Sequence, residues 1–183
     1  MSTDAHSLMS VYKGWDGYQI GLMHAIAPLS SEQLAWRGAP HLRSVGELAA
    51  HVVMGRIGWI HHILGVESTE VTQWLVAWSA GGTLKQDVEQ NAGALVSGLE
   101  ATWKMIENVL NRWTTDDLGK TLLHPYQGKT YALPRQWILW RIMAHDIHHG
   151  GEIAFALGMQ GIDLPELGDL GGHLIEPPLA ESS

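Results

Sequence analysis

The chain has 183 residues, of which 45% are hydrophobic and 16% are charged. This length and composition are typical of one globular domain that buries a core of its own. The formal net charge of −8 argues against nucleic-acid binding, which depends on clustered Lys and Arg side chains. Because the chain contains no cysteine, disulfides, thiolate ligands, iron–sulfur clusters and cysteine nucleophiles are excluded.

Neither a signal peptide nor a membrane span is expected. Residues 1–14 contain an acidic residue and lack a basic segment ahead of an apolar run, unlike a secretory leader. No apolar stretch reaches the roughly 18 to 20 residues that a membrane-spanning helix requires. We therefore expect a soluble cytoplasmic protein that acts on a small molecule, without a membrane or a nucleic acid as partner.

The first half of the chain predicts two helices from the spacing of its apolar residues. The first is expected over residues 7–26. Three glycines lie together on one side of this helix: Gly14, Gly17 and Gly21. They either allow another helix to approach closely, within the chain or across a dimer, or are scattered glycines that the helix tolerates. The second is expected over residues 44–64, because Ser44 and Glu47 have the spacing of a capping box.

The second half predicts two more helices. One is expected to begin at Thr83, with Gln86 in capping-box spacing, and carries the clearest apolar stripe, up to Leu110. The other is expected from Pro134 to Leu157, since proline suits the first turn of a helix. Between the helices we expect a linker over residues 66–82, with an apolar piece at 71–78, and an irregular segment over 114–132 with a turn or hairpin at 127–128.

These four segments predict an all-α fold. Four helices of this length pack as an antiparallel four-helix bundle, with a longer crossover where the connections are long. We expect the bundle to occupy residues 1–162 and residues 163–183, which are rich in glycine and proline, to form an irregular C-terminal tail. The sequence shows neither an internal repeat nor a second domain.

The fourth predicted helix carries the residues that point to chemistry. His145 and His149 are four residues apart, so their imidazoles lie on one helix face and can share a metal ion. His148, three residues from His145, competes for the same role. A helical wheel favours His149, because its stripe also contains Arg141 and Glu152, whereas the His148 direction carries residues that suit packing.

His51 is the candidate third ligand. It lies on the apolar second helix, and Gly55 and Gly58 follow on its face. Glycine inside a helix costs about 1 kcal/mol relative to alanine, so both glycines suggest that space is kept for a metal and its ligand. A histidine of this kind is also common in protein cores, and the sequence leaves both interpretations open.

Several familiar sites are absent from the sequence. Asp146 follows His145, so the His-Glu-x-x-His motif of zinc proteases is missing. Glu-x-x-His does not occur, which excludes the di-iron carboxylate bundle. His62 is about 16 Å along the helix from His51, too far to share a metal ion, although it can line the mouth of a cavity. The histidines without a partner at useful spacing are expected at the surface: His6, His24, His41, His124 and His173.

Together these residues resemble the DinB-like family. The matching pieces are Ser-Val-Gly-Glu-Leu-Ala-Ala-His over residues 44–51 and His-Asp-Ile-His-His-Gly-Gly-Glu-Ile over residues 145–153, followed by Gly158 and Gly161. The resemblance spans roughly residues 5–162. Two positions depart from the family pattern: Arg56 stands where relatives often carry an acidic residue, and Gly150 replaces the usual arginine of His-His-Arg-Gly.

The resemblance implies an up-down-down-up four-helix bundle, usually homodimeric, that binds zinc or nickel. The implied ligands are His51, His145 and His149. Members of the family with assigned activities include thiol-dependent S-transferases and maleylpyruvate isomerase, which use mycothiol, bacillithiol or glutathione. A low-molecular-weight thiol is therefore a candidate cosubstrate.

Three functional hypotheses follow. The first is a metal-dependent transferase or hydrolase with an open coordination position, in which Arg141 anchors a substrate carboxylate and Glu152 acts as base or supports a ligand. A salt bridge to a neighbouring helix and a solvated pair near the helix end are the alternatives for these two residues. The second hypothesis is a non-catalytic metal- or small-molecule-binding stress protein. The third is b-type haem between His51 and His145.

Overall fold

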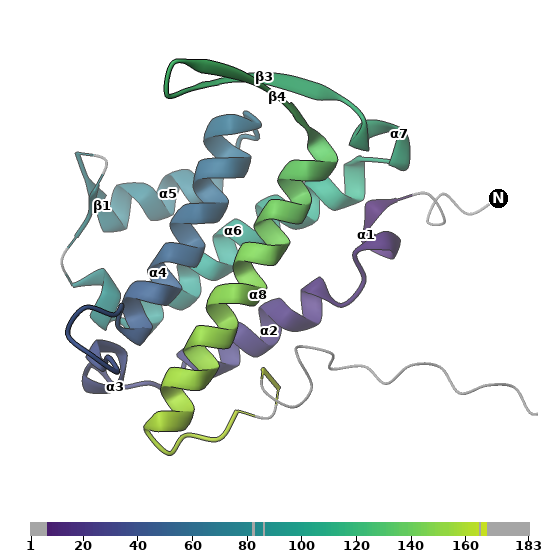
Figure 1. Cartoon of the computed structure of the whole chain (residues 1–183). Coiled ribbons are helices and arrows are strands. Elements are labelled where there is room, and N and C mark those ends of the chain that lie inside the picture. The colour runs from purple at the N-terminus through teal and green to yellow at the C-terminus, as the bar shows by residue number, and fades with distance from the viewer. Residues whose placement is uncertain (1–6, 82, 86, 165, 168–183) are drawn as a thin grey trace, which may run out of the picture.

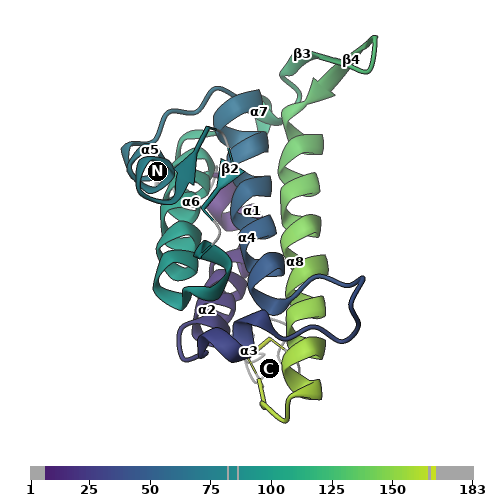
Figure 2. The same cartoon turned by 90° about the vertical axis from the view of Figure 1, so that its left-hand side faces the viewer.

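The computed structural model describes residues 7–81, 83–85, 87–164, 166 and 167. Four long helices form the body of the protein (Figures 1 and 2): α2 (Trp15–Ile26), α4 (Val45–Arg56), α6 (Ala92–Arg112) and α8 (Arg135–Met159). Helix α4 packs against both α6 and α8, and α2 also contacts α6 and α8. The four helices therefore surround one core, as the predicted bundle requires.

Contacts at the helix ends establish the direction of each helix. The short α3 (Ser31–Ala35) and the 3-10 turn η3 (Val88–Gln90), which precedes α6, both pack on the start of α4. At the end of α8, Gln160 donates a hydrogen bond to the Gln33 carbonyl (3.4 Å). Leu8, in α1 (Leu8–Val11), donates to the Trp113 carbonyl just after α6 (3.2 Å). Consequently, α2 and α8 run in one direction and α4 and α6 in the other.

The core consists of the apolar faces of these helices. The stripe predicted for the third helix is confirmed, because its members on α6 are all 0% exposed: Leu95, Leu99, Ile106 and Leu110. Facing side chains from the other long helices are equally buried: Leu22, Val53 and Ile138. Among the described residues, no helix has both the length and the apolar character needed to cross a membrane.

The predicted first helix is interrupted. Gly14 has φ of 104°, a left-handed conformation that residues with a side chain rarely adopt, and it separates α1 from α2. The prediction of one helix over residues 7–26 is therefore wrong. Gly21 meets the end of the described chain, since a Cβ added there would lie 3.4 Å from Leu167 Cδ2. Leu167 belongs to the C-terminal tail that was expected from residue 163 onward. The rest of that tail, residues 165 and 168–183, lies outside the described residues.

The predicted second helix is confirmed at both ends. Ser44 Oγ accepts a hydrogen bond from the Glu47 amide (3.2 Å), and the Glu47 carboxylate accepts one from the Ser44 amide (2.7 Å). After Arg56 the helix continues as a π-helix, η2 (Ile57–Ile63), and it ends at Gly65, whose φ is 69°. The wider π turn was not predicted, and such turns occur often at functional sites.

The predicted start of the third helix is wrong. Thr83 lies in β2 (Thr83–Leu84), which pairs with β1 (Ser79–Ala80), and Gln86 lies outside the described residues. Helix α6 instead begins at Ala92, where Asn91 Oδ1 accepts a hydrogen bond from the Ala94 amide (3.0 Å). Asparagine is among the strongest N-cap residues, so a local signal was present there.

The apolar piece predicted within the linker is the helix α5 (Thr69–Trp78). Ser68 Oγ caps it by accepting from the Val71 amide (3.2 Å). Trp74 holds it on the bundle, because its indole donates to the Ala94 carbonyl (2.9 Å) and lies where a Cβ on Gly98 would clash, at 2.7 Å. A helix of this length is not stable by itself in water, so packing against α6 stabilises α5.

The predicted hairpin is confirmed. After the short α7 (Thr115–Leu118), β3 (Thr121–Tyr126) and β4 (Lys129–Pro134) pair antiparallel. Their turn residues, Gln127 and Gly128, have φ of 48° and 74°, as a tight two-residue hairpin turn requires. The hairpin leads directly into α8 and lies at one end of the bundle (Figure 1), where its residues line a cavity together with residues of η2.

Candidate metal centre

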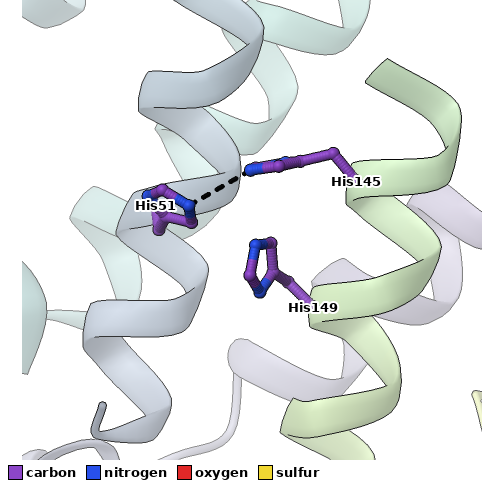
Figure 3. Close-up of side chains that lie close together, drawn as sticks. All are labelled: His51, His145 and His149. Carbon is purple, nitrogen blue, oxygen red and sulfur yellow. Dashed lines mark hydrogen bonds between the residues drawn. The ribbon is translucent and has the colours of Figure 1, made fainter. Parts of the chain in front are cut away.

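Three imidazoles converge between α4 and α8. His51 extends from α4, and His145 and His149 extend from successive turns of α8 (Figure 3). One ring nitrogen of each lies within 4.8 Å of the others, and the Nε2 atoms of His51 and His145 are 3.2 Å apart. Spacing and resemblance predicted these three residues. The structure brings them together although His51 and His145 are 94 residues apart in the sequence.

A glycine on α4 makes room for this cluster. A Cβ added to Gly55 would lie 2.7 Å from His145 Cε1, too close for any real contact. An added Cβ on Gly58 would meet no described atom within 4 Å. Gly55 therefore keeps space for the His145 ring, whereas Gly58 borders open space beyond it.

The competitor His148 is exposed, and its ring lies 4.8 Å from the ring of His149. Its side chain is 68% exposed, against 9% for His149, and its Nε2 lies 3.6 Å from a Glu152 oxygen. His148, His149 and Glu152 are close enough to form a second, more exposed group of candidate ligands. The group that includes His51 is the more enclosed of the two and contains the predicted pair.

Glu152 supports one of the three rings. Its Oε2 lies 2.7 Å from His149 Nδ1. We assign the proton to Nδ1, because an ionised carboxylate can only accept it, and this tautomer leaves Nε2 free to bind a metal ion. A carboxylate behind a histidine ligand orients the ring and raises its basicity.

Burial keeps two of the rings in the form that metals bind. Desolvation, followed by the neighbouring His149 and His51, lowers the pKa of His145 to about 4. Desolvation and then Arg43 also lower the pKa of His51. Both rings are therefore neutral at pH 7, and a neutral imidazole has the lone pair that a metal ion requires.

The donor set fits a divalent transition metal. Three imidazoles with a supporting carboxylate suit zinc or nickel better than magnesium or calcium, which prefer oxygen ligands. Three protein ligands also leave a coordination position for another molecule, as in catalytic zinc sites. The residues thus fit the cofactor that the sequence resemblance implies.

Arg141 lies at the edge of the site. It is exposed, lines a cavity with Gly55 and Gly58, and its charge helps to lower the pKa of His145. The alternative prediction for Arg141 was a salt bridge to a neighbouring helix. Among the described residues, no carboxylate lies within ion-pair distance of it. Its guanidinium is therefore available to the cavity.

Sequence reasoning missed a buried polar network behind the histidines. Arg56 is 0% exposed and donates to both Asp146 carboxylate oxygens and to Gln19 Oε1 (2.7 Å). Asp146 also accepts from the Trp15 indole (2.9 Å). The signal in the sequence is an arginine and an aspartate on otherwise apolar helix faces, whereas the family pattern marks Arg56 only as a departure.

The second departure, Gly150, has a structural reason. A Cβ at this position would lie 1.9 Å from the Tyr18 hydroxyl, which donates to the Ile147 carbonyl (3.1 Å). Burial, reinforced by Asp146, raises the pKa of Tyr18 to about 12, so the hydroxyl stays protonated. Tyr18 therefore occupies the space that an arginine would need.

Of the other described histidines, His41 is exposed and lines a cavity together with His51, and His124 lines the cavity that borders Gly55. His24 is exposed and contacts Glu166 (2.8 Å), and His61 contacts the Val66 carbonyl (2.9 Å). The rings of His61 and His62 are 5.0 Å apart at the end of η2. His6 and His173 lie outside the described residues.

Comparisons with known proteins identify the family and the fold. The sequence model of the DinB superfamily matches residues 21–153, which confirms the resemblance seen in the histidine motif. A DinB-like protein from Bacillus cereus ATCC 10987 is 20% identical with a TM-score of 0.62, covering 87% of this chain and 97% of its own. A conserved protein from Enterococcus faecalis is 15% identical with a TM-score of 0.60, covering 79% and 91%. These two structures share the fold. No curated protein matches the chain.

Proposed function

This chain belongs to the DinB superfamily, and on that premise we propose that it is a metal-dependent enzyme whose ligands are His51, His145 and His149. The ion is zinc or nickel, with one coordination position open to substrate. The observation that carries the proposal is the convergence of three imidazoles from two helices within 4.8 Å.

The metal ion, when bound, acts as a Lewis acid that lowers the pKa of a thiol or water and so provides a nucleophile near neutral pH. The chain's own residues bind and orient. Glu152 holds the His149 ring through the 2.7 Å contact at Nδ1. Arg141 carries a positive charge at the rim, where it can bind a substrate carboxylate through two hydrogen bonds.

Two cavities support a transfer reaction with two reactants. His51 lines a cavity of about 420 Å³ that also contains Arg37 and Arg43. A cavity of about 750 Å³ borders Gly55 and Arg141, next to His145. We propose that one holds a low-molecular-weight thiol as cosubstrate and the other its electrophilic partner. A hydrolase would need only one of the two.

We also propose that the enzyme is a homodimer. Exposed apolar side chains on the outer side of α8, including Ile147 (50% exposed) and Phe155 (71% exposed), support a contact between two copies. Light scattering on the purified protein measures the mass directly, and a monomer at micromolar concentration would contradict this part of the proposal.

The haem hypothesis does not fit the geometry. Two axial imidazoles are separated by twice the iron–nitrogen distance, about 4 Å for bonds of the length typical of imidazole, with a flat macrocycle between them. The Nε2 atoms of His51 and His145 are 3.2 Å apart, and the His149 ring lies 4.4 Å from that of His145. The second candidate therefore remains the non-catalytic metal-binding protein.

Metal content and turnover together test the proposal. Untagged protein is expected to contain about one zinc or nickel ion per chain by elemental analysis. It should conjugate glutathione, bacillithiol or mycothiol to electrophiles in a reaction that a chelator abolishes and the metal restores. Metal without turnover would favour the non-catalytic alternative. Protein that holds no transition metal and is unaffected by chelators would overturn the function and leave the fold intact.

A further inference from the structure

The cavity of about 750 Å³ that borders Gly55 and Arg141 is built largely from aromatic side chains. Its lower wall is formed by η2 and α8, where the rings of Trp59 and Trp137 pack edge to face with centroids 5.5 Å apart. Trp140, 60% exposed, is the next aromatic residue along α8. Gly55 and Gly58 leave its floor without side chains.

The hairpin supplies the opposite wall. His124 pairs with Tyr131, and Leu122 pairs with Leu133, so the residues of β3 and β4 that line the cavity share one face of the hairpin: His124, Tyr126, Tyr131 and Leu133. Tyr126 and Tyr131 are 56% and 43% exposed. The hairpin face that lines the cavity is thus aromatic, and its tyrosine rings are partly exposed to solvent.

A positive charge, that of Arg141, lines the cavity beside these aromatic groups. Arg141 is the single Arg, Lys, Asp or Glu among the described residues that line the cavity, and no described carboxylate pairs with it. The volume of about 750 Å³ falls within the range of about 300 to 1,000 Å³ typical of small-molecule sites. The walls favour a flat ring, and the guanidinium favours an anion that can take two hydrogen bonds.

We propose that this cavity binds a small aromatic carboxylate, with its ring between the tryptophans and the hairpin tyrosines and its carboxylate on Arg141. Gly55 lines the cavity and adjoins His145, so a molecule bound there would lie beside the proposed metal site. That this molecule is the substrate rests on the proposed function. Binding itself requires only the cavity and its arginine.

Calorimetric titration with 1-naphthoate and its neutral analogue 1-naphthamide tests the inference. Both are titrated at pH 7 into the full chain as purified and after treatment with a chelator. Arg141→Gln should weaken naphthoate about 10-fold or more, the value of a charge-assisted hydrogen bond, and should leave naphthamide unchanged. Trp140→Ala should weaken both compounds. Arg112→Gln, an exposed arginine at the end of α6, is the matched control and should bind both like the wild type.

Several results would overturn the inference: equal affinity for acid and amide, Arg141→Gln behaving like Arg112→Gln, or no binding to protein whose circular dichroism shows it folded. Naphthoate that binds only the metal-loaded protein, whatever residue 141 is, would also overturn it. The metal proposal is tested separately by elemental analysis. Arg141-dependent binding to a protein that takes up no metal would leave this inference standing and the proposed function refuted.

Discussion

Arg56 and Asp146 form an ion pair in which neither side chain is exposed (0% and 0%), with Nη2 and Oδ2 2.9 Å apart. Asp146 directly follows His145 on α8, and Arg56 lies on the helix that carries His51. The pair therefore fixes how α4 and α8 face each other, with the carboxylate in the core and the imidazole of the preceding residue at the site. It thereby stabilises the arrangement of the three-histidine cluster from within the core.

Asp146→Ala should destabilise the protein by about 3 to 5 kcal/mol, because it leaves a buried guanidinium without its counter-charge. The double variant Arg56→Met/Asp146→Ala should lose less than the sum of the two single changes, since it removes both charges. Urea unfolding of the four proteins measures the difference. Strictly additive losses would show that the two side chains do not depend on each other.

The two glycines on α4 provide a matched pair of substitutions. Gly55→Ala should abolish or greatly weaken metal binding, because the new methyl group would displace the His145 ring. Gly58→Ala should retain the metal, since its Cβ meets no described atom within 4 Å. Zinc titration with a chromophoric chelator compares them. Equal zinc affinity in the two variants would mean that His145 is not a ligand.

Replacing the ligands one at a time tests their assignment. His51→Ala, His145→Ala and His149→Ala should each weaken metal binding by about 100-fold or more, beyond the 10- to 100-fold effect typical of supporting residues. His148→Ala is the control, because that side chain is 68% exposed. Retention of full metal by His149→Ala together with loss by His148→Ala would reverse the assignment.

Glu152→Gln should weaken metal binding by about 10- to 100-fold without unfolding the protein, since an amide oxygen accepts the His149 proton less strongly than a carboxylate. Glu107→Gln, an exposed glutamate on α6, is the matched control. Competition with a chelator of known affinity measures both variants. If the two behave alike, the contact of 2.7 Å does not support the ligand.

Asp117 should make the stability of the hairpin base depend on pH. Hydrogen bonds from Lys120 and from the Thr114 amide lower the pKa of Asp117 to about 2, from an ordinary value of 3.8, and Arg135 lies 3.3 Å away. A carboxyl group with a lowered folded pKa stabilises above its unfolded pKa and loses that effect as the pH falls through the folded value.

Asp117→Asn should therefore lower the melting temperature at pH 7, and the difference from wild type should shrink between pH 4 and pH 2. Melting curves by circular dichroism across this range measure it. A difference that stays constant with pH would show that the carboxylate charge at this position contributes nothing to stability.

Local patterns in the sequence predicted much of this structure. Ser44 and Glu47 cap α4 as their spacing indicates, the stripe on α6 is buried, and Gln127-Gly128 turns a hairpin. The failures were also local in origin. The apolar spacing predicts a helix through Gly14, which instead adopts a left-handed φ, and the spacing of Thr83 and Gln86 imitates a helix cap although Thr83 lies in a strand.

Spacing by itself determined that His145 and His149 share one face of α8, because the period of a helix is a local property. Only the tertiary structure decided that His51, 94 residues before His145, reaches that face, that Gly55 makes room for the His145 ring, and that Arg56 pairs with Asp146. Those contacts depend on how two helices rotate and approach when their apolar faces are buried together. No local pattern carries that information, since packing is chosen by the whole chain at once.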